Sequence, residues 1–124
     1  MKKIILLTAL ISNILFAQSA EEIIDTNACF FCHAIASKKT APAFAGIAKK
    51  NKRFDATNAK SNIINSIKNG SKGKFRKFAN SEMPAFSHLS NTELNLVADY
   101  ILSQSSKARG CAGNHGAQGS RKGI

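Results

Sequence analysis

The chain has 124 residues, of which 44% are hydrophobic, and its 18 Lys and Arg outnumber 7 Asp and Glu to give a formal net charge of +11. This length holds one small domain, because domains usually have about 100–200 residues, and it excludes a two-domain enzyme with a separate cofactor domain. The hydrophobic content is that of a globular protein. A domain this small often needs a covalent or metal-bound group to complete its core.

The first 19 residues have the layout of a secretory signal peptide. Lys2 and Lys3 precede a mostly apolar run at 4–16, and small or polar residues follow it. The run is too short to span a bilayer, which takes about 20 residues. We therefore predict cleavage between 17 and 20, export to the periplasm, and a mature chain with a net charge of +9. The alternative is an uncleaved interfacial anchor.

Capping residues and apolar spacing predict helices along the compact part of the chain, at 20–106. Ser19 and Glu22 have the capping-box spacing of a helix that runs on into residues 29–33. A short helix is expected at 44–50, and a further helix is expected to begin at Asn58 and to end at Gly70.

The last predicted helix begins at Ser90, which forms a second capping-box pattern with Glu93. Its apolar face is formed by residues at helical spacing: Leu94, Val97, Ala98, Ile101 and Leu102. No segment alternates cleanly with period two, so the predicted fold class is all-α, with about four short helices in one small domain.

The most informative segment is Cys29-Phe30-Phe31-Cys32-His33. Two cysteines three residues apart on a helical turn can both add to the vinyl groups of one haem, and the adjacent histidine then reaches the iron. The spacing is therefore typical of c-type haem attachment, and export agrees with it because c-type haem is attached outside the cytoplasm.

Two other interpretations of this segment remain open. A Cys-x-x-Cys pair can be a redox disulfide, although such sites lie in βαβ units and no strand pattern is visible. A zinc site needs four ligands, usually from two paired clusters. The chain's other Cys and His residues are His88, Cys111 and His115, and they include no second Cys-x-x-Cys.

A haem iron with six ligands needs a second axial ligand, and Met83 is the methionine that remains after Met1 leaves with the signal sequence. Pro84 follows it and would stiffen the ligand loop. A thioether stabilises ferrous iron and raises the reduction potential. Met83 could instead fill the core, and His88, five residues later, competes as a ligand that would give a lower potential.

The last segment, 107–124, contains five of the chain's eight glycines and several basic residues. Glycine at this frequency loses much chain entropy on ordering, so we predict a flexible basic tail. Cys111 in this tail, four residues before His115, could form an intermolecular disulfide or bind a soft metal, or the tail could have no such role.

The chain resembles the class I c-type cytochromes, most closely the small bacterial cytochrome c551/c552 group, over about 21–104. Four segments in order carry the resemblance. They are Cys29-Phe30-Phe31-Cys32-His33, Lys38-Lys39-Thr40-Ala41-Pro42-Ala43-Phe44, Ile67-Lys68-Asn69-Gly70-Ser71-Lys72-Gly73, and Met83-Pro84 followed by a terminal helix ending Asp99-Tyr100-Ile101-Leu102.

The resemblance implies an all-helical protein with one covalently bound haem c (iron) and His/Met ligation. Cys29 and Cys32 look like the thioether attachments, His33 like the proximal ligand and Met83 like the distal ligand. Pro42 matches the proline whose carbonyl accepts the ring N–H of the proximal histidine, a bond that fixes the tautomer and raises the basicity of the ligand.

The sequence departs from the family pattern in two places. Thr40-Ala41 replaces the usual Val-Gly before Pro42, and a phenylalanine stands where the family often has a tryptophan that donates to a haem propionate. The candidates for this position are Phe75 and Phe78, and the candidates to replace its hydrogen bond are Lys74, Arg76 and Lys77. Because the haem would supply much of the core, we also expect the haem-free chain to fold poorly.

The resulting functional prediction is a soluble, monomeric, diffusible electron carrier of the periplasm and not an enzyme. Basic clusters at 38–39, 49–53 and 72–77 favour redox partners with acidic docking surfaces, such as a membrane cytochrome oxidase, a quinol–cytochrome c reductase or a periplasmic reductase. Nucleic acid is not an expected partner of an exported protein. The alternative is a haem-based sensor or peroxidase-like enzyme with an open sixth position, and Met83 discriminates between the two.

Overall fold

The computed structural model describes residues 17–108, so the predicted signal sequence up to residue 16 and the predicted tail from residue 109, with Cys111 and His115, lie outside the described residues. The elements in chain order are α1 (Ala20–Thr26), α2 (Cys29–Cys32), α3 (Phe44–Phe54), α4 (Ala59–Asn69), β1 (Ser71–Lys72), η1 (Arg76–Phe78), β2 (Glu82–Met83), α5 (Asn91–Ser103) and η2 (Gln104–Lys107), where η marks a 3-10 helix. The described chain is mainly helical, as the sequence predicted.

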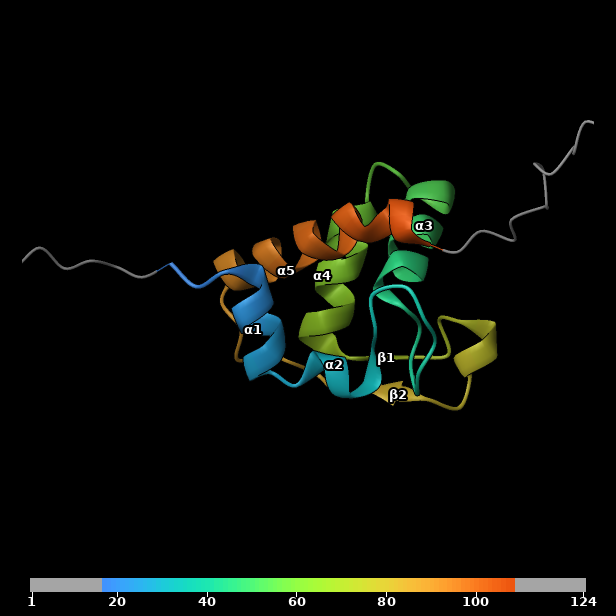
Figure 1. Ribbon diagram of the computed structural model, residues 1–124, viewed down its shortest axis with the longest axis horizontal. Helices are drawn as coiled ribbons and strands as arrows, with labels where there is room; N and C mark the ends of the chain where they lie inside the picture. The colour runs from blue at the N-terminus through green and yellow to red at the C-terminus, as the bar shows by residue number, and fades with distance from the viewer. Residues whose placement is uncertain (1–16, 109–124) are drawn as a thin grey trace, which may run out of the picture.

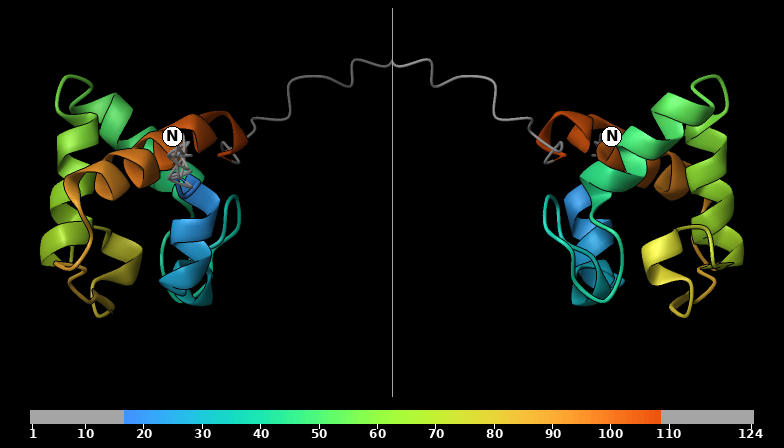
Figure 2. Two further views of the ribbon diagram at one scale, coloured as in Figure 1. Left: turned by 90° about the vertical axis from the view of Figure 1, so that its left-hand side faces the viewer. Right: turned by 90° about the vertical axis from the view of Figure 1, so that its right-hand side faces the viewer.

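Helix α5 is the element against which the others pack. It contacts α1, α3 and α4, and η2 continues it against α3 (Figure 1). Beneath α5 the chain separates into two walls, with α1, α2 and the loop after α2 on one side and α4, η1 and β2 on the other (Figure 2). This arrangement brings residues near positions 30 and 80 to the same region of the molecule.

The start and the buried face of α5 both follow from its sequence. Ser90 Oγ accepts a hydrogen bond from the Glu93 N–H at 3.2 Å, and Glu93 Oε2 accepts one from the Ser90 N–H at 2.7 Å, which completes the predicted capping box. These bonds hold the pKa of Glu93 below its usual value because they favour the ionised carboxylate. The predicted apolar face is largely buried, with Leu94 and Ala98 fully inaccessible.

The first helix is shorter than the sequence predicted, because it stops before the cysteine pair. Ser19 Oγ caps it by accepting from the Glu22 N–H, but α1 ends at Thr26. Asn27 Nδ2 donates back to the Ile23 carbonyl, and Ala28 takes a left-handed conformation at φ 54°. A non-glycine residue there is strained. The chain thereby changes direction before α2, which the capping-box pattern gave no reason to expect.

Helices α3 and α4 are joined by a turn that Asp55 organises. Helix α3 continues past the predicted end at residue 50 to Phe54, with Lys52 and Arg53 in the last turn, where cations favour the negative end of the helix dipole. Asn58 precedes α4 as predicted, but its side chain donates to Asp55 instead of capping the helix. Asn62 also donates to Asp55, and these bonds lower the pKa of that carboxyl.

A two-stranded antiparallel ladder adds a small β element to the predicted all-helical fold. Ser71 pairs with Met83 and Lys72 with Glu82. Two-residue strands leave no period-two pattern in a sequence, so this pairing was not predictable from alternation. Gly70, the predicted end of α4, has φ 76° and ψ 172°, a conformation open essentially to glycine alone, and it turns the chain into β1.

The apolar core lies where α1, α3, α4 and α5 meet. Its buried members are Ile23, Ile24, Phe44, Ala48, Ile63, Ile67, Leu89, Leu94, Val97, Ala98 and Ile101. Within residues 17–108, no helix has both the length and the apolar character needed to cross a bilayer.

Candidate functional site

A cavity of about 710 Å³ opens between the two walls beneath α5. Most of its lining is apolar and comes from side chains of every main helix, including Ile23, Phe44, Ile63, Ile67, Val97 and Ile101. Its size is within the range of pockets that hold organic ligands, about 300–1,000 Å³. The helices therefore surround an apolar cavity that their own side chains do not fill.

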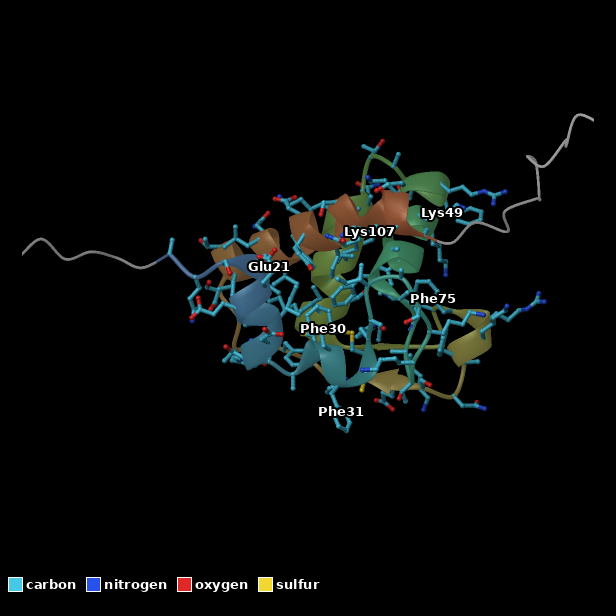
Figure 3. The ribbon with its side chains drawn as sticks, viewed as in Figure 1. Glu21, Phe30, Phe31, Lys49, Phe75 and Lys107 are labelled. Carbon is cyan, nitrogen blue, oxygen red and sulfur yellow. The ribbon has the colours of Figure 1, made fainter. Side chains whose placement is uncertain are left out.

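The cysteine pair lies on the wall formed by α2. Because α2 is a single turn, Cys29 and Cys32 lie three residues apart on one face, and both line the cavity as half-buried free thiols. Burial raises the pKa of Cys29, so its sulfur is held as a thiol. Phe31, between them, is 82% exposed and points away from the body of the molecule (Figure 3).

His33 is buried, with 7% of its surface exposed, and its ring orientation is fixed from two sides. Its Nδ1 lies 2.7 Å from the Pro42 carbonyl oxygen, and the Phe44 ring stacks on it with centroids 5.2 Å apart. A carbonyl oxygen can only accept, so Nδ1 carries the proton and Nε2 keeps a free lone pair. Desolvation lowers the pKa of His33, which favours the neutral, metal-binding form of the ring.

The loop that brings Pro42 to His33 is held by backbone hydrogen bonds. The Ala41 N–H donates to the Cys32 carbonyl at 3.0 Å, and the Phe44 N–H donates to the Ala34 carbonyl at 2.9 Å. The Thr40-Ala41 pair, where the family usually has Val-Gly, therefore still allows a closed turn. This loop links the attachment segment directly to the start of α3.

Met83 lies on the other wall of the same cavity and is half-buried. Its backbone pairs with Ser71, and the Phe86 N–H donates to the Ile67 carbonyl at 2.8 Å three residues later. These two bonds tie the Met83–Phe86 segment to the end of α4. A neutral thioether and a neutral imidazole thus line one cavity from opposite walls.

His88, the competing ligand considered above, does not line this cavity. It is exposed, its Nε2 lies 2.8 Å from Asn27 Oδ1, and its ring packs near Phe86. The zinc interpretation also lacks support, because no group of three or more His, Cys, Asp and Glu side chains in residues 17–108 could hold a metal ion.

Polar and basic side chains also line the cavity, and sequence reasoning identified only some of the residues concerned. Lys74, Phe75 and Phe78 line the cavity, as do Lys50, Asn51, Asn62 and Ser66. Arg76 and Lys77, which the sequence also suggested, line an adjoining groove that shares Lys50, Phe75 and Phe78 with the cavity. Lys50 was recognisable only as one member of a basic cluster, because the sequence does not show which face of α3 meets the cavity.

The donor set and the cavity fit a covalently attached haem. Two adjacent thiols, a histidine with a free Nε2 lone pair, a thioether and an otherwise apolar hollow are the groups that such a cofactor requires. Within the described residues these groups all line one cavity. A redox disulfide would need neither the cavity nor the histidine and the thioether. Fold and site together define a c-type cytochrome.

The comparisons with known proteins give the same class. A family model described as cytochrome c matches residues 17–105, and the chain belongs to this family. No curated protein gives a significant match. The family implies covalently bound haem c and a role as an electron carrier.

Solved structures of small bacterial class I cytochromes share the fold. Cytochrome c552 of Nitrosomonas europaea is 28% identical with a TM-score of 0.60, and the match covers 68% of this chain and 98% of that one. A deletion mutant of the same cytochrome is 27% identical with a TM-score of 0.58, covering 68% and 98%. The class 1 cytochrome MtoD of Sideroxydans lithotrophicus ES-1 is 22% identical with a TM-score of 0.55, covering 69% and 92%, and it supports the fold alone.

Proposed function

We propose that this chain is a periplasmic, single-haem, one-electron carrier with His33 and Met83 as the axial ligands. The observation that carries this proposal is that His33, Met83, Cys29 and Cys32 line one apolar cavity. The Cys-x-x-Cys-His motif occurs once in the sequence, which supports a single haem. A bound haem supplies the ferric/ferrous couple that accepts and releases one electron.

The chain's own contribution is to hold two neutral ligands rigidly in a water-poor hollow. The Pro42 carbonyl fixes the tautomer of His33 and increases its basicity, and the Phe44 ring restricts its rotation. Met83 is tied through its backbone to β1, and a thioether ligand favours ferrous iron and raises the potential. A closed site of this kind suits electron transfer better than sensing or peroxidase chemistry, which needs an open sixth position.

Met83→Ala tests the ligand assignment. In the haem-loaded wild type we expect a low-spin ferric spectrum with a sulfur-to-iron charge-transfer band, and the variant should lose this band completely and take up carbon monoxide. His88→Ala is the matched control and should leave the spectrum unchanged. A high-spin wild type, or one that binds carbon monoxide readily, would support the sensor or peroxidase alternative; a low-spin wild type without the sulfur band would contradict Met83 ligation.

We further propose that the partners are redox proteins with acidic docking faces, such as a membrane cytochrome oxidase, a quinol–cytochrome c reductase or a periplasmic reductase. The support is the net charge of +9 expected after removal of the signal sequence. Exposed Phe31 beside the attachment cysteines would add an apolar contact within such an interface.

Electrostatic steering predicts a salt-dependent reaction rate. The bimolecular electron-transfer rate with an acidic redox protein should fall about tenfold or more between low ionic strength and about 0.5 M salt. Reduction by an uncharged small molecule, measured by stopped-flow absorbance, is the control and should change little. A rate that stays constant or rises with salt would rule out acidic partners of this kind.

A further inference from the structure

We propose that Lys50 and Lys74 form the binding site for the carboxylates of the haem, in place of the aromatic donor that this chain lacks. The inference rests on the proposed haem binding and assigns residues that neither the motif nor the family match identifies. It follows from the position of these two lysines in the lining of a mostly apolar cavity.

The two lysines come from different elements and meet at the same place. Lys50 Nζ lies 4.2 Å from the centroid of the Phe75 ring and donates a hydrogen bond to the Lys74 carbonyl oxygen. Lys74 Nζ donates to Ser66 Oγ at 2.6 Å, and both lysines line the cavity. Lys50 from α3 thus contacts the backbone of Lys74 in the segment after β1, and both lysines line the same cavity.

Charge balance argues that this pair is built for an anionic ligand. Lys60 pairs with Asp99 and Lys72 with Glu82, whereas neither Lys50 nor Lys74 forms an ion pair within residues 17–108. A carboxylate bound at this wall of the cavity would supply the opposite charge that the two ammonium groups lack. Asn51, Asn62 and Ser66 also line the cavity and are further sources of hydrogen bonds.

Two acidic groups also line the cavity, and both already have partners. Asp55 accepts hydrogen bonds from Asn58 and Asn62, and Glu82 lies 3.6 Å from Lys72 on the two-stranded ladder. Asp55 keeps its charge because those bonds lower its pKa. The lysine pair is therefore left for the ligand.

The other candidates do not fit this role. Phe75 has no hydrogen-bond donor, although its ring contacts the Lys50 ammonium group. Arg76 and Lys77 on η1, which are exposed like Lys74, line an adjoining groove that also includes Lys50 and Phe75, but neither of them lines the cavity that contains the cysteine pair, His33 and Met83. Lys49, the neighbour of Lys50 on α3, is exposed and lines neither.

The test is the pH dependence of the reduction potential of the haem-loaded protein. A nearby carboxylate binds protons more tightly when the iron is reduced, so the potential falls with rising pH across the pKa of that carboxylate. Two cations hold this pKa low. In Lys50→Gln and Lys74→Gln, the pH range over which the reduction potential falls should therefore move to higher pH by about one unit or more. In Lys50→Arg, which keeps the positive charge, this pH range should be that of the wild type.

Matched controls make the result specific to this pair. Lys49→Gln and Lys77→Gln each remove one positive charge from a neighbouring position. In both, the pH range over which the reduction potential falls should stay within about 0.3 pH unit of the wild-type range. The far-UV circular dichroism and the sulfur-to-iron band of each variant report whether the fold and the Met83 ligand are intact, so a failure of the ligand assignment is seen separately in the wild type. Wild-type titration in both Lys50→Gln and Lys74→Gln, or a shift of equal size in Lys77→Gln, would overturn the proposal.

Discussion

The chain without haem is expected to lose most of its helical structure. Apolar side chains of every main helix line the cavity, and without a haem they would face water or empty space. Burial of apolar surface is the dominant favourable contribution to folding, and a typical domain is stable by only about 5–15 kcal/mol. The folded arrangement of the helices therefore depends on an occupied cavity.

The helices cannot compensate by themselves. Helix α5 is the longest at 13 residues, and α3 and α4 have 11 each. Isolated helices shorter than about 12–15 residues are marginal in water. Without the haem, α2 would also lose the covalent attachment that Cys29 and Cys32 provide, and α1 precedes it directly in the chain.

The Cys29→Ser/Cys32→Ser double variant, compared with the haem-loaded wild type, measures this dependence. We expect a weak far-UV helical signal and no cooperative transition in urea or on heating. Cys111→Ser is the control for a lost thiol, and it should unfold like the wild type. A double variant that unfolds cooperatively with most of the wild-type helical signal would show that the polypeptide alone specifies the fold.

Gly70→Ala is expected to destabilise the haem-loaded protein and to weaken the proposed contact of Met83 with the iron. A Cβ at this position would lie 2.7 Å from the Met83 carbonyl oxygen and 3.2 Å from the Ala85 backbone nitrogen. Backbone atoms cannot rotate away as a flexible side chain can, so the Met83–Pro84 segment must shift. The left-handed φ of 76° adds about 1–3 kcal/mol of conformational strain for any other residue.

Gly73→Ala separates these two causes. Gly73 has a similar φ of 69°, but a Cβ there would have nothing within 4 Å, so this variant measures the cost of a positive φ without the close backbone contact. Urea unfolding should show a larger loss for Gly70→Ala than for Gly73→Ala, and the sulfur-to-iron band should weaken only in Gly70→Ala. Equal losses with an unchanged band in both variants would mean that the close approach to Met83 has no effect on the ligand.

The local features of this protein were predictable because neighbouring residues determine them. The capping box of Ser90 and Glu93 needs only residues three apart, and Gly70 ends α4 because glycine alone tolerates that turn. The spacing of Cys29 and Cys32 puts both sulfurs on one helical turn wherever that turn lies. The haem motif and most helix boundaries therefore follow from the sequence.

The site depended on contacts between distant parts of the chain. Met83 and His88 are five residues apart, and only the pairing of β1 with β2 decides that Met83 lines the cavity while His88 lies beside Asn27. The change of chain direction at Ala28 also depends on tertiary structure, because its φ of 54° lies outside the negative range that alanine prefers.

The sequence by itself determined the class of protein, the attachment segment and the helical composition, because these depend on residue type and on short spacings. Only the tertiary structure decided which basic side chains meet the cavity. Lys50 and Lys49 are adjacent and chemically identical, but the packing of α3 directs Lys50 toward Phe75 and leaves Lys49 exposed. Side-chain direction relative to a cavity is fixed by the packing of whole elements, and that packing is a property of the assembled fold.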